Sequence, residues 1–148
     1  LREFREHLGG ELHVTLLRGI GRPFEVTEMD EALVAAALEE LAPVKVVGTA
    51  DDEAPALDWL SQADGIVDLV IIDIFLKAGT GLGVLRAASS LAQRRNVVVL
   101  SNYATPDMRR KCLALGASRV FDKSNEIDAL IQYCAQLAGG ETGFGDQD

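Results

Sequence analysis

Short apolar runs alternate along the chain with longer segments in which apolar residues recur at helical spacing. Four such runs lie at residues 44–47, 69–72, 97–100 and 119–121. They alternate so little between apolar and polar positions that both faces of each strand are expected to be buried. The pattern predicts repeated strand-helix units and therefore an α/β fold around a parallel sheet.

The segments between these runs have the spacing of amphipathic helices. Apolar residues recur every three or four positions in three of them, with Val34, Leu38 and Leu41 in the first, Met108, Cys112 and Leu115 in the second, and Ile127, Leu130, Ile131, Cys134 and Leu137 in the third. Each stripe would bury one side of a helix. We therefore expect helices that lie on the sheet.

Two segments compete to be the first strand. Residues 12–17 have the better strand composition, whereas residues 22–26 contain Pro23, which cannot donate to a strand ladder. The second segment nevertheless leads directly into the first helix. The residues alone leave both alternatives open.

The length, net charge and cysteine content of the chain limit the class of protein to which it can belong. The chain has 148 residues, enough for one domain, and a formal net charge of −9 that would repel a nucleic-acid backbone. Its two cysteines lack metal-binding spacing, and no apolar stretch reaches the roughly 18 residues of a membrane span. We expect a cytoplasmic protein that binds neither nucleic acid nor membrane.

We take residues 22–138 as the domain and residues 1–21 as an N-terminal segment of uncertain structure. Residues 139–148 are rich in glycine and acid without periodicity. This composition is typical of a disordered tail.

Three polar residues follow predicted strands. Asp73 comes directly after residues 69–72, Ser101 directly after residues 97–100, and Lys123 two residues beyond the last strand. Because the carboxyl ends of parallel strands share one edge of the sheet, where ligands bind in open α/β folds, we expect these side chains to converge. A carboxylate there can attack phosphorus, and an ammonium and a hydroxyl can hold the phosphoryl oxygens.

These stretches resemble the response-regulator receiver domain of two-component signalling, over residues 22–138. Residues 68–76 and 79–82 resemble the phospho-acceptor strand and its loop, residues 97–104 the switch strand, and residues 116–124 the strand that ends in a lysine. The resemblance implies a doubly wound, flavodoxin-like fold. Its five parallel strands would follow the order 2-1-3-4-5, which is that of chemotaxis receivers.

The resemblance also implies a role for each site residue. Asp73 would accept the phosphoryl group, Ser101 would bind it through its hydroxyl, and Lys123 would pair with it. Mg²⁺ would be held by Asp73, by the backbone carbonyl of Phe75 and by Glu25.

The metal site departs from the family pattern of two adjacent acids after the first strand. Counting back from the first helix places Glu25 and Val26 there, so one acid is missing. Mg²⁺ keeps several waters, so the remaining oxygens could suffice. If residues 12–17 are the first strand, no acid follows it at once and the metal site becomes doubtful.

Two further departures from the family pattern concern the residues that relay phosphorylation to the surface of the domain. Val120 stands where the family usually has an aromatic residue, so that part of the relay would be absent or moved to Phe121 or Tyr103. Ser124 stands where a proline usually follows Lys123, which removes the reason to expect a cis peptide there. The basic residues 109–111 are interpreted as a solvated helix face, with a docking patch as the alternative.

The function that this resemblance implies is that of a single-domain response regulator. It would take a phosphoryl group from a histidine kinase or phosphotransfer protein and act by contact with a downstream protein, as a monomer or a homodimer. It would not be an enzyme beyond its own phosphorylation and slow dephosphorylation. The alternative is a pseudo-receiver that binds proteins without phosphorylation. A nucleotide- or flavin-binding protein is disfavoured because no glycine-rich turn follows the first strand.

Overall fold

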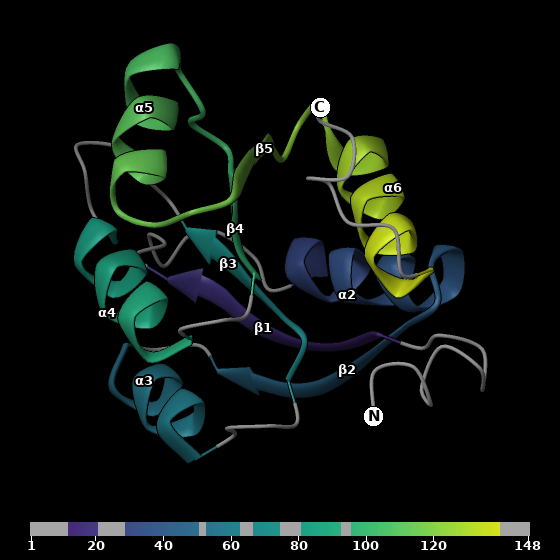
Figure 1. Ribbon diagram of the computed structural model, residues 1–148. Coiled ribbons are helices and arrows are strands. Elements are labelled where there is room, and N and C mark those ends of the chain that lie inside the picture. Colours follow the sequence, from purple (N-terminus) through teal and green to yellow (C-terminus); the bar gives the residue numbers. More distant parts are fainter. Residues whose placement is uncertain are drawn as a thin grey trace.

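Strands and helices alternate along the chain in a computed structural model, which describes residues 12–20, 29–50, 53–62, 67–74, 81–92 and 96–139 (Figure 1). The strands are β1 (Leu12–Ile20), β2 (Val44–Ala50), β3 (Leu69–Ile74), β4 (Asn96–Ser101) and β5 (Arg119–Asp122). The helices are α2 (Met29–Leu41), α3 (Glu53–Gln62), α4 (Leu82–Ala92), α5 (Pro106–Ala114) and α6 (Ile127–Ala138).

The five strands pair in parallel in the order β2-β1-β3-β4-β5. This topology confirms the predicted doubly wound, flavodoxin-like sheet. The chain adds β2 on one side of β1 and then returns to add β3, β4 and β5 on the other side. The direction of winding therefore reverses between β1 and β3, and the carboxyl ends of these two strands flank the switch point where ligands bind in such sheets.

The first strand is the earlier of the two alternatives. β1 pairs with both β2 and β3, and Leu12, Val14, Leu16 and Leu17 are buried. The alternative segment, residues 22–26, lies outside the described residues. The predicted start of the domain at residue 22 is too late, because β1 lies near the middle of the sheet and supplies part of its core.

Helices cover both faces of the sheet, with α3, α4 and α5 on one face and α2 and α6 on the other (Figure 1). Successive strand residues point to opposite faces. Leu17 and Ile72 pack in the first layer, whereas Leu16 and Ile71 pack in the second. β3 is buried along its whole length, which accounts for the unbroken apolar run that predicted it.

Trp59 of α3 fixes the contact between that helix and the edge of the sheet. Its indole Nε1 donates a hydrogen bond to Thr15 Oγ1 at 2.9 Å. A Cβ atom at Gly48 would overlap the indole ring, so only glycine lets the helix approach β2 this closely. Trp59 therefore has a packing role between α3, β1 and β2.

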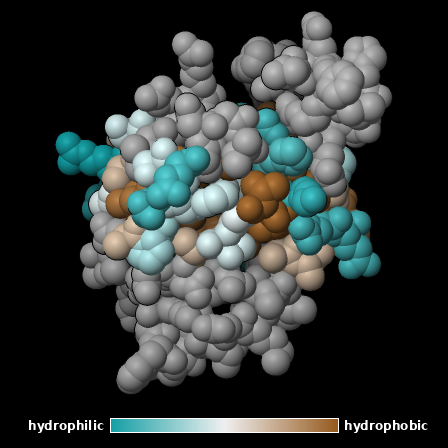
Figure 2. Space-filling model, turned by 90° about the horizontal axis from the view of Figure 1, so that it is seen from below, coloured by the Kyte–Doolittle hydropathy of each residue, from teal (hydrophilic) through white to brown (hydrophobic). Residues whose placement is uncertain are grey.

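The described surface carries few large hydrophobic side chains. Leu41, Tyr103 and Leu113 are the exposed ones among the described residues. On the face seen from below, hydrophobic residues form small separate spots between hydrophilic ones (Figure 2). Scattered residues of this kind are ordinary on folded proteins.

Among the described helices, none combines the length and apolar character needed to cross a bilayer.

Candidate functional site

Asp73 lies near the carboxyl end of β3, with only 1% of its surface exposed. It is paired with Leu100 of β4, and the next pair along the ladder joins Ile74 to Ser101. Ser101 is in turn paired with Asp122, the last residue of β5. The sheet therefore brings Asp73, Ser101 and the residue after Asp122 to one edge, as the strand pattern predicted.

That next residue, Lys123, forms a buried ion pair with Asp73. Its Nζ lies 3.2 Å from Oδ1 and 3.0 Å from Oδ2 of the carboxylate. The side chains are only 14% and 2% exposed, respectively. A carboxylate buried to this degree requires a partner of opposite charge, because desolvation strongly disfavours an unpaired ion.

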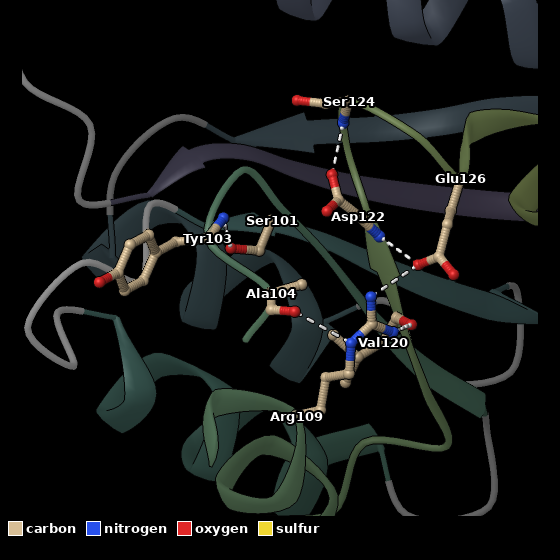
Figure 3. A network of polar contacts seen from close by, with 8 residues as sticks. All are labelled: Ser101, Tyr103, Ala104, Arg109, Val120, Asp122, Ser124 and Glu126. Carbon is tan, nitrogen blue, oxygen red and sulfur yellow. Dashed lines mark hydrogen bonds and ion pairs between the residues drawn. The ribbon is translucent and has the colours of Figure 1, made fainter. Parts of the chain in front are cut away.

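Ser101 is fully buried beside this pair and is fixed by local hydrogen bonds. Its Oγ accepts a hydrogen bond from the backbone N–H of Tyr103 at 2.9 Å (Figure 3). Its carbonyl oxygen accepts one from the backbone N–H of Lys123 at 2.8 Å. A serine hydroxyl can accept and donate at the same time, so Oγ can still donate to an anion at this edge.

The described residues do not by themselves form a magnesium site. The last three residues of β1 are Arg18, Gly19 and Ile20, none of which is an acid. In the pairing of β1 with β3, Leu17 lies opposite Ile72 and Ile20 lies opposite Ile74. This end of β1 therefore runs alongside Asp73 without contributing an acid. Among the described residues, no three His, Cys, Asp or Glu side chains come close enough together to hold a metal ion. Mg²⁺ needs several oxygen ligands. The other predicted ligands, Glu25 and the Phe75 carbonyl, lie outside the described residues.

The loop that carries Lys123 is held by its neighbours. The backbone N–H of Ser124 donates to Asp122 Oδ1 at 2.7 Å, and the backbone N–H of Glu126 donates to the Asp122 carbonyl at 2.7 Å. Asp122 thus organises a turn of the kind that aspartate favours. No cis peptide bond occurs among the described residues, in agreement with the expectation drawn from Ser124.

Arg109 of α5 joins this loop to the loop after β4. Its Nε donates to the Ala104 carbonyl at 3.0 Å, one terminal nitrogen to the Val120 carbonyl at 3.1 Å and the other to Glu126 Oε1 at 2.9 Å (Figure 3). Glu126 Oε1 also accepts a hydrogen bond from the backbone N–H of Asp122 at 2.7 Å. This backbone bond, followed by the bond from Arg109, lowers the pKa of Glu126 below its ordinary value.

The sequence-based interpretation of residues 109–111 is therefore wrong for Arg109. The side chains of Arg110 and Lys111 are 72% and 53% exposed and pair only with Asp107 of the same helix in the described contacts. Arg109 instead makes three contacts with other parts of the chain. No sequence signal identifies it, because two of its partners are backbone carbonyls.

Comparison with known proteins agrees with this geometry. The sequence model for the response regulator receiver domain family matches residues 28–135. The signal receiver domain of NarL from Mycobacterium tuberculosis is similar in structure, with a TM-score of 0.68 and 22% identity over 88% of this chain and 98% of that one. A response regulator from Thermotoga maritima gives a TM-score of 0.65 and 20% identity over 88% of this chain and 98% of that one.

A third similar structure is a response regulator protein from Burkholderia pseudomallei that contains a phosphorylated aspartic acid, a calcium ion and citrate. Its TM-score is 0.64 and its identity 15%, over 87% of this chain and 69% of that one. At these identities the solved structures establish the fold, whereas the family match spans most of the chain and includes Asp73, Ser101 and Lys123. The chain therefore belongs to the response regulator receiver domain family.

Proposed function

We propose that this receiver domain accepts a phosphoryl group on Asp73 and signals by a change in its surface. The observation that carries the proposal is the placement of Lys123 Nζ on both oxygens of a buried carboxylate. Two further features distinguish this ion pair from a purely structural one. The buried hydroxyl of Ser101 lies on the adjacent strand. The pair also lies at the switch point of the sheet, where ligands bind in such folds.

The proposed reaction is attack by one Asp73 oxygen on the phosphorus of a donor. The new Oδ–P bond forms as the bond from phosphorus to the donor's leaving atom breaks, and that atom keeps the electron pair. Negative oxygens approach a negative nucleophile in this step, so positive charge must be in place beforehand. Lys123 supplies that charge, and the Ser101 hydroxyl can donate to a phosphoryl oxygen.

The surface response is proposed to pass through the segment after β4. Val120 is buried and has no aromatic ring to swing outward, and Phe121 is only 1% exposed. Tyr103 is 44% exposed and its backbone N–H is bound to Ser101 Oγ. Of the two predicted substitutes for the missing aromatic switch, Tyr103 is therefore the better placed.

The donor in the cell is proposed to be a histidine kinase or a phosphotransfer protein, and the output a contact with a downstream protein. The chain would act as a single-domain regulator in the cytoplasm, without catalysing any reaction on another molecule. These assignments follow from the function of the family and remain proposals for this chain.

The experiment is mass spectrometry after incubation with a small phosphodonor such as acetyl phosphate. We expect one added phosphoryl group that maps to Asp73 and disappears in Asp73→Asn. The matched control is Asp107→Asn, whose carboxylate lies on the exposed face of α5 and should not affect labelling. Labelling that persists in Asp73→Asn, or that never occurs, contradicts the proposal.

A second candidate function is a pseudo-receiver that binds proteins without phosphorylation. The end of β1 favours it, because the stretch of β1 alongside Asp73, residues 18–20, contains no acid. The same experiment separates the two candidates. A domain that binds its partner equally well as wild type and as Asp73→Asn, and that takes up no phosphoryl group, is a pseudo-receiver.

A further inference from the structure

Arg109 contacts both loops that form the phospho-acceptor site, although it lies on a helix outside it. One contact is to Ala104, three residues beyond Ser101. The other two are to Val120 and Glu126, on either side of Lys123 along the chain. A guanidinium is planar and its N–H groups point in fixed directions, so three acceptors bound at once are held in fixed relation to one another.

Glu126 extends this link to the residue next to Lys123. Its Oε1 accepts from Arg109 and from the backbone N–H of Asp122, so one carboxylate oxygen joins α5 to the end of β5. The backbone N–H of Lys123 donates to the Ser101 carbonyl in addition. The position of Lys123 relative to Ser101 is therefore set by two hydrogen bonds, one from the backbone of Asp122 to Glu126 and one from the backbone of Lys123 to Ser101.

The ion pair between Arg109 and Glu126 is partly exposed to solvent. The two side chains are 33% and 37% exposed, and pairs at this exposure contribute little to folding. Of the two backbone carbonyls that Arg109 also binds, that of Ala104 lies in the loop after β4 and that of Val120 lies in β5, just before the lysine loop. The arrangement is suited to fixing the two loops in register.

We propose that Arg109 is a positioning residue for Lys123, which it holds in reach of Asp73 while tying the lysine loop to the Ser101 loop. Phosphorylation of Asp73 would draw Lys123 and Ser101 toward the phosphoryl oxygens. Because both loops are bound to one guanidinium, they would move together and carry α5 with them. This coupling would act in place of the aromatic switch that Val120 cannot provide.

The test combines ¹⁵N NMR of the Lys123 ammonium with phosphodonor labelling. Arg109→Gln removes the guanidinium, whereas Arg109→Lys keeps the positive charge without the planar geometry. Arg110→Gln is the control on the exposed side of the same helix. We expect both Arg109 variants to shift the Lys123 Nζ signal and to lower the rate of Asp73 labelling on the order of tenfold. Arg110→Gln should change neither.

Asp73→Asn gives the readout that a purely structural role would not affect. If Arg109 acts by placing Lys123 against the carboxylate, the Nζ shift caused by Arg109→Gln should be much smaller in the Asp73→Asn background. Glu126→Ala provides an independent route should Arg109→Gln fold poorly, since it removes the shared acceptor without altering α5. It should shift the Nζ signal in the same direction.

Two results would overturn the inference. One is an unchanged Lys123 signal in folded Arg109→Gln or Glu126→Ala. The other is full retention of the wild-type signal and labelling rate in Arg109→Lys, which would mean that charge alone suffices. The labelling measurement rests on the proposed function, but the NMR measurement does not. A domain that never labels and still shows the Nζ shifts would refute the proposed function and support the positioning role.

Discussion

Lys123 binds both carboxylate oxygens of Asp73 across a separation of 50 residues along the chain. The ion pair joins β3 to the loop after β5, and both side chains are almost fully removed from solvent. The same ion pair therefore contributes to the stability of the fold and places the lysine charge on the carboxylate at the edge of the sheet.

Lys123→Met should destabilise the domain by about 3 kcal/mol, because it leaves a buried carboxylate without this partner. Urea unfolding at neutral pH measures the loss. Lys111→Met is the control, since Lys111 pairs with Asp107 on the surface and should cost less than about 1 kcal/mol. The double variant Asp73→Asn/Lys123→Met should recover much of the stability. Equal losses in the two single lysine variants would mean that burial does not govern the pair.

Gly48→Ala should destabilise the domain by about 1–3 kcal/mol, because the added methyl group overlaps the ring of Trp59. Gly83→Ala is the matched control in α4, where an added Cβ meets nothing within 4 Å. That substitution should be neutral or stabilise the helix by up to about 1 kcal/mol. Thermal unfolding followed by Trp59 fluorescence compares the two. A loss of similar size in both would show that the indole is not what restricts position 48.

The later strands, and the convergence of Asp73, Ser101 and Lys123 at one edge of the sheet, could be predicted because their signals are local. Residues 69–72 form an unbroken apolar run, so the strand and the acid that follows it were evident. The first strand remained ambiguous because the proximity of residues 22–26 to the helix competed with the composition of residues 12–17. The contacts of Arg109 were not predictable, since its partners lie 5, 11 and 17 residues away and two of them are carbonyls that every residue has.

Both cysteine thiols should resist alkylation in the folded protein. Burial raises the pKa of Cys134 to about 12 and also raises the pKa of Cys112, so the reactive thiolate is scarce at pH 8. Incubation with iodoacetamide should label neither residue in native buffer and both in concentrated urea, as read by mass spectrometry. Native labelling at the rate of a free thiol would indicate that the helices carrying them open readily.

The stability contributed by Glu126 should depend on acid pH. Its pKa is lowered in the folded state by the hydrogen bond from Asp122 and then by Arg109, so the charged form is favoured by folding. The contribution is therefore fully present above the ordinary value of 4.5 and is lost as the pH falls through the lower folded value. The difference in urea midpoint between wild type and Glu126→Gln should be constant near neutrality and shrink below about pH 4.5. A difference that does not vary with pH would exclude this charge effect.

The dependence of the Asp73 site on Mg²⁺ should be weak. Receivers with acids at the end of the first strand present several oxygens to a metal, whereas the part of β1 alongside Asp73 contains Arg18 and Gly19. Lys123 already neutralises the buried carboxylate, which weakens its attraction for a second cation. We therefore expect the melting temperature and the rate of Asp73 labelling to be nearly the same with Mg²⁺ and with a chelator.

The informative comparison is with Arg18→Asp/Gly19→Asp, which introduces two acids into the stretch of β1 that runs alongside Asp73. This variant should gain a saturable rise in melting temperature with Mg²⁺, because the metal would relieve repulsion among three carboxylates. Glu25→Gln tests the remaining predicted ligand and should leave the wild-type response unchanged. If wild type already responds strongly to Mg²⁺ and Glu25→Gln abolishes that response, then Glu25 reaches the site and compensates for the acids that β1 lacks.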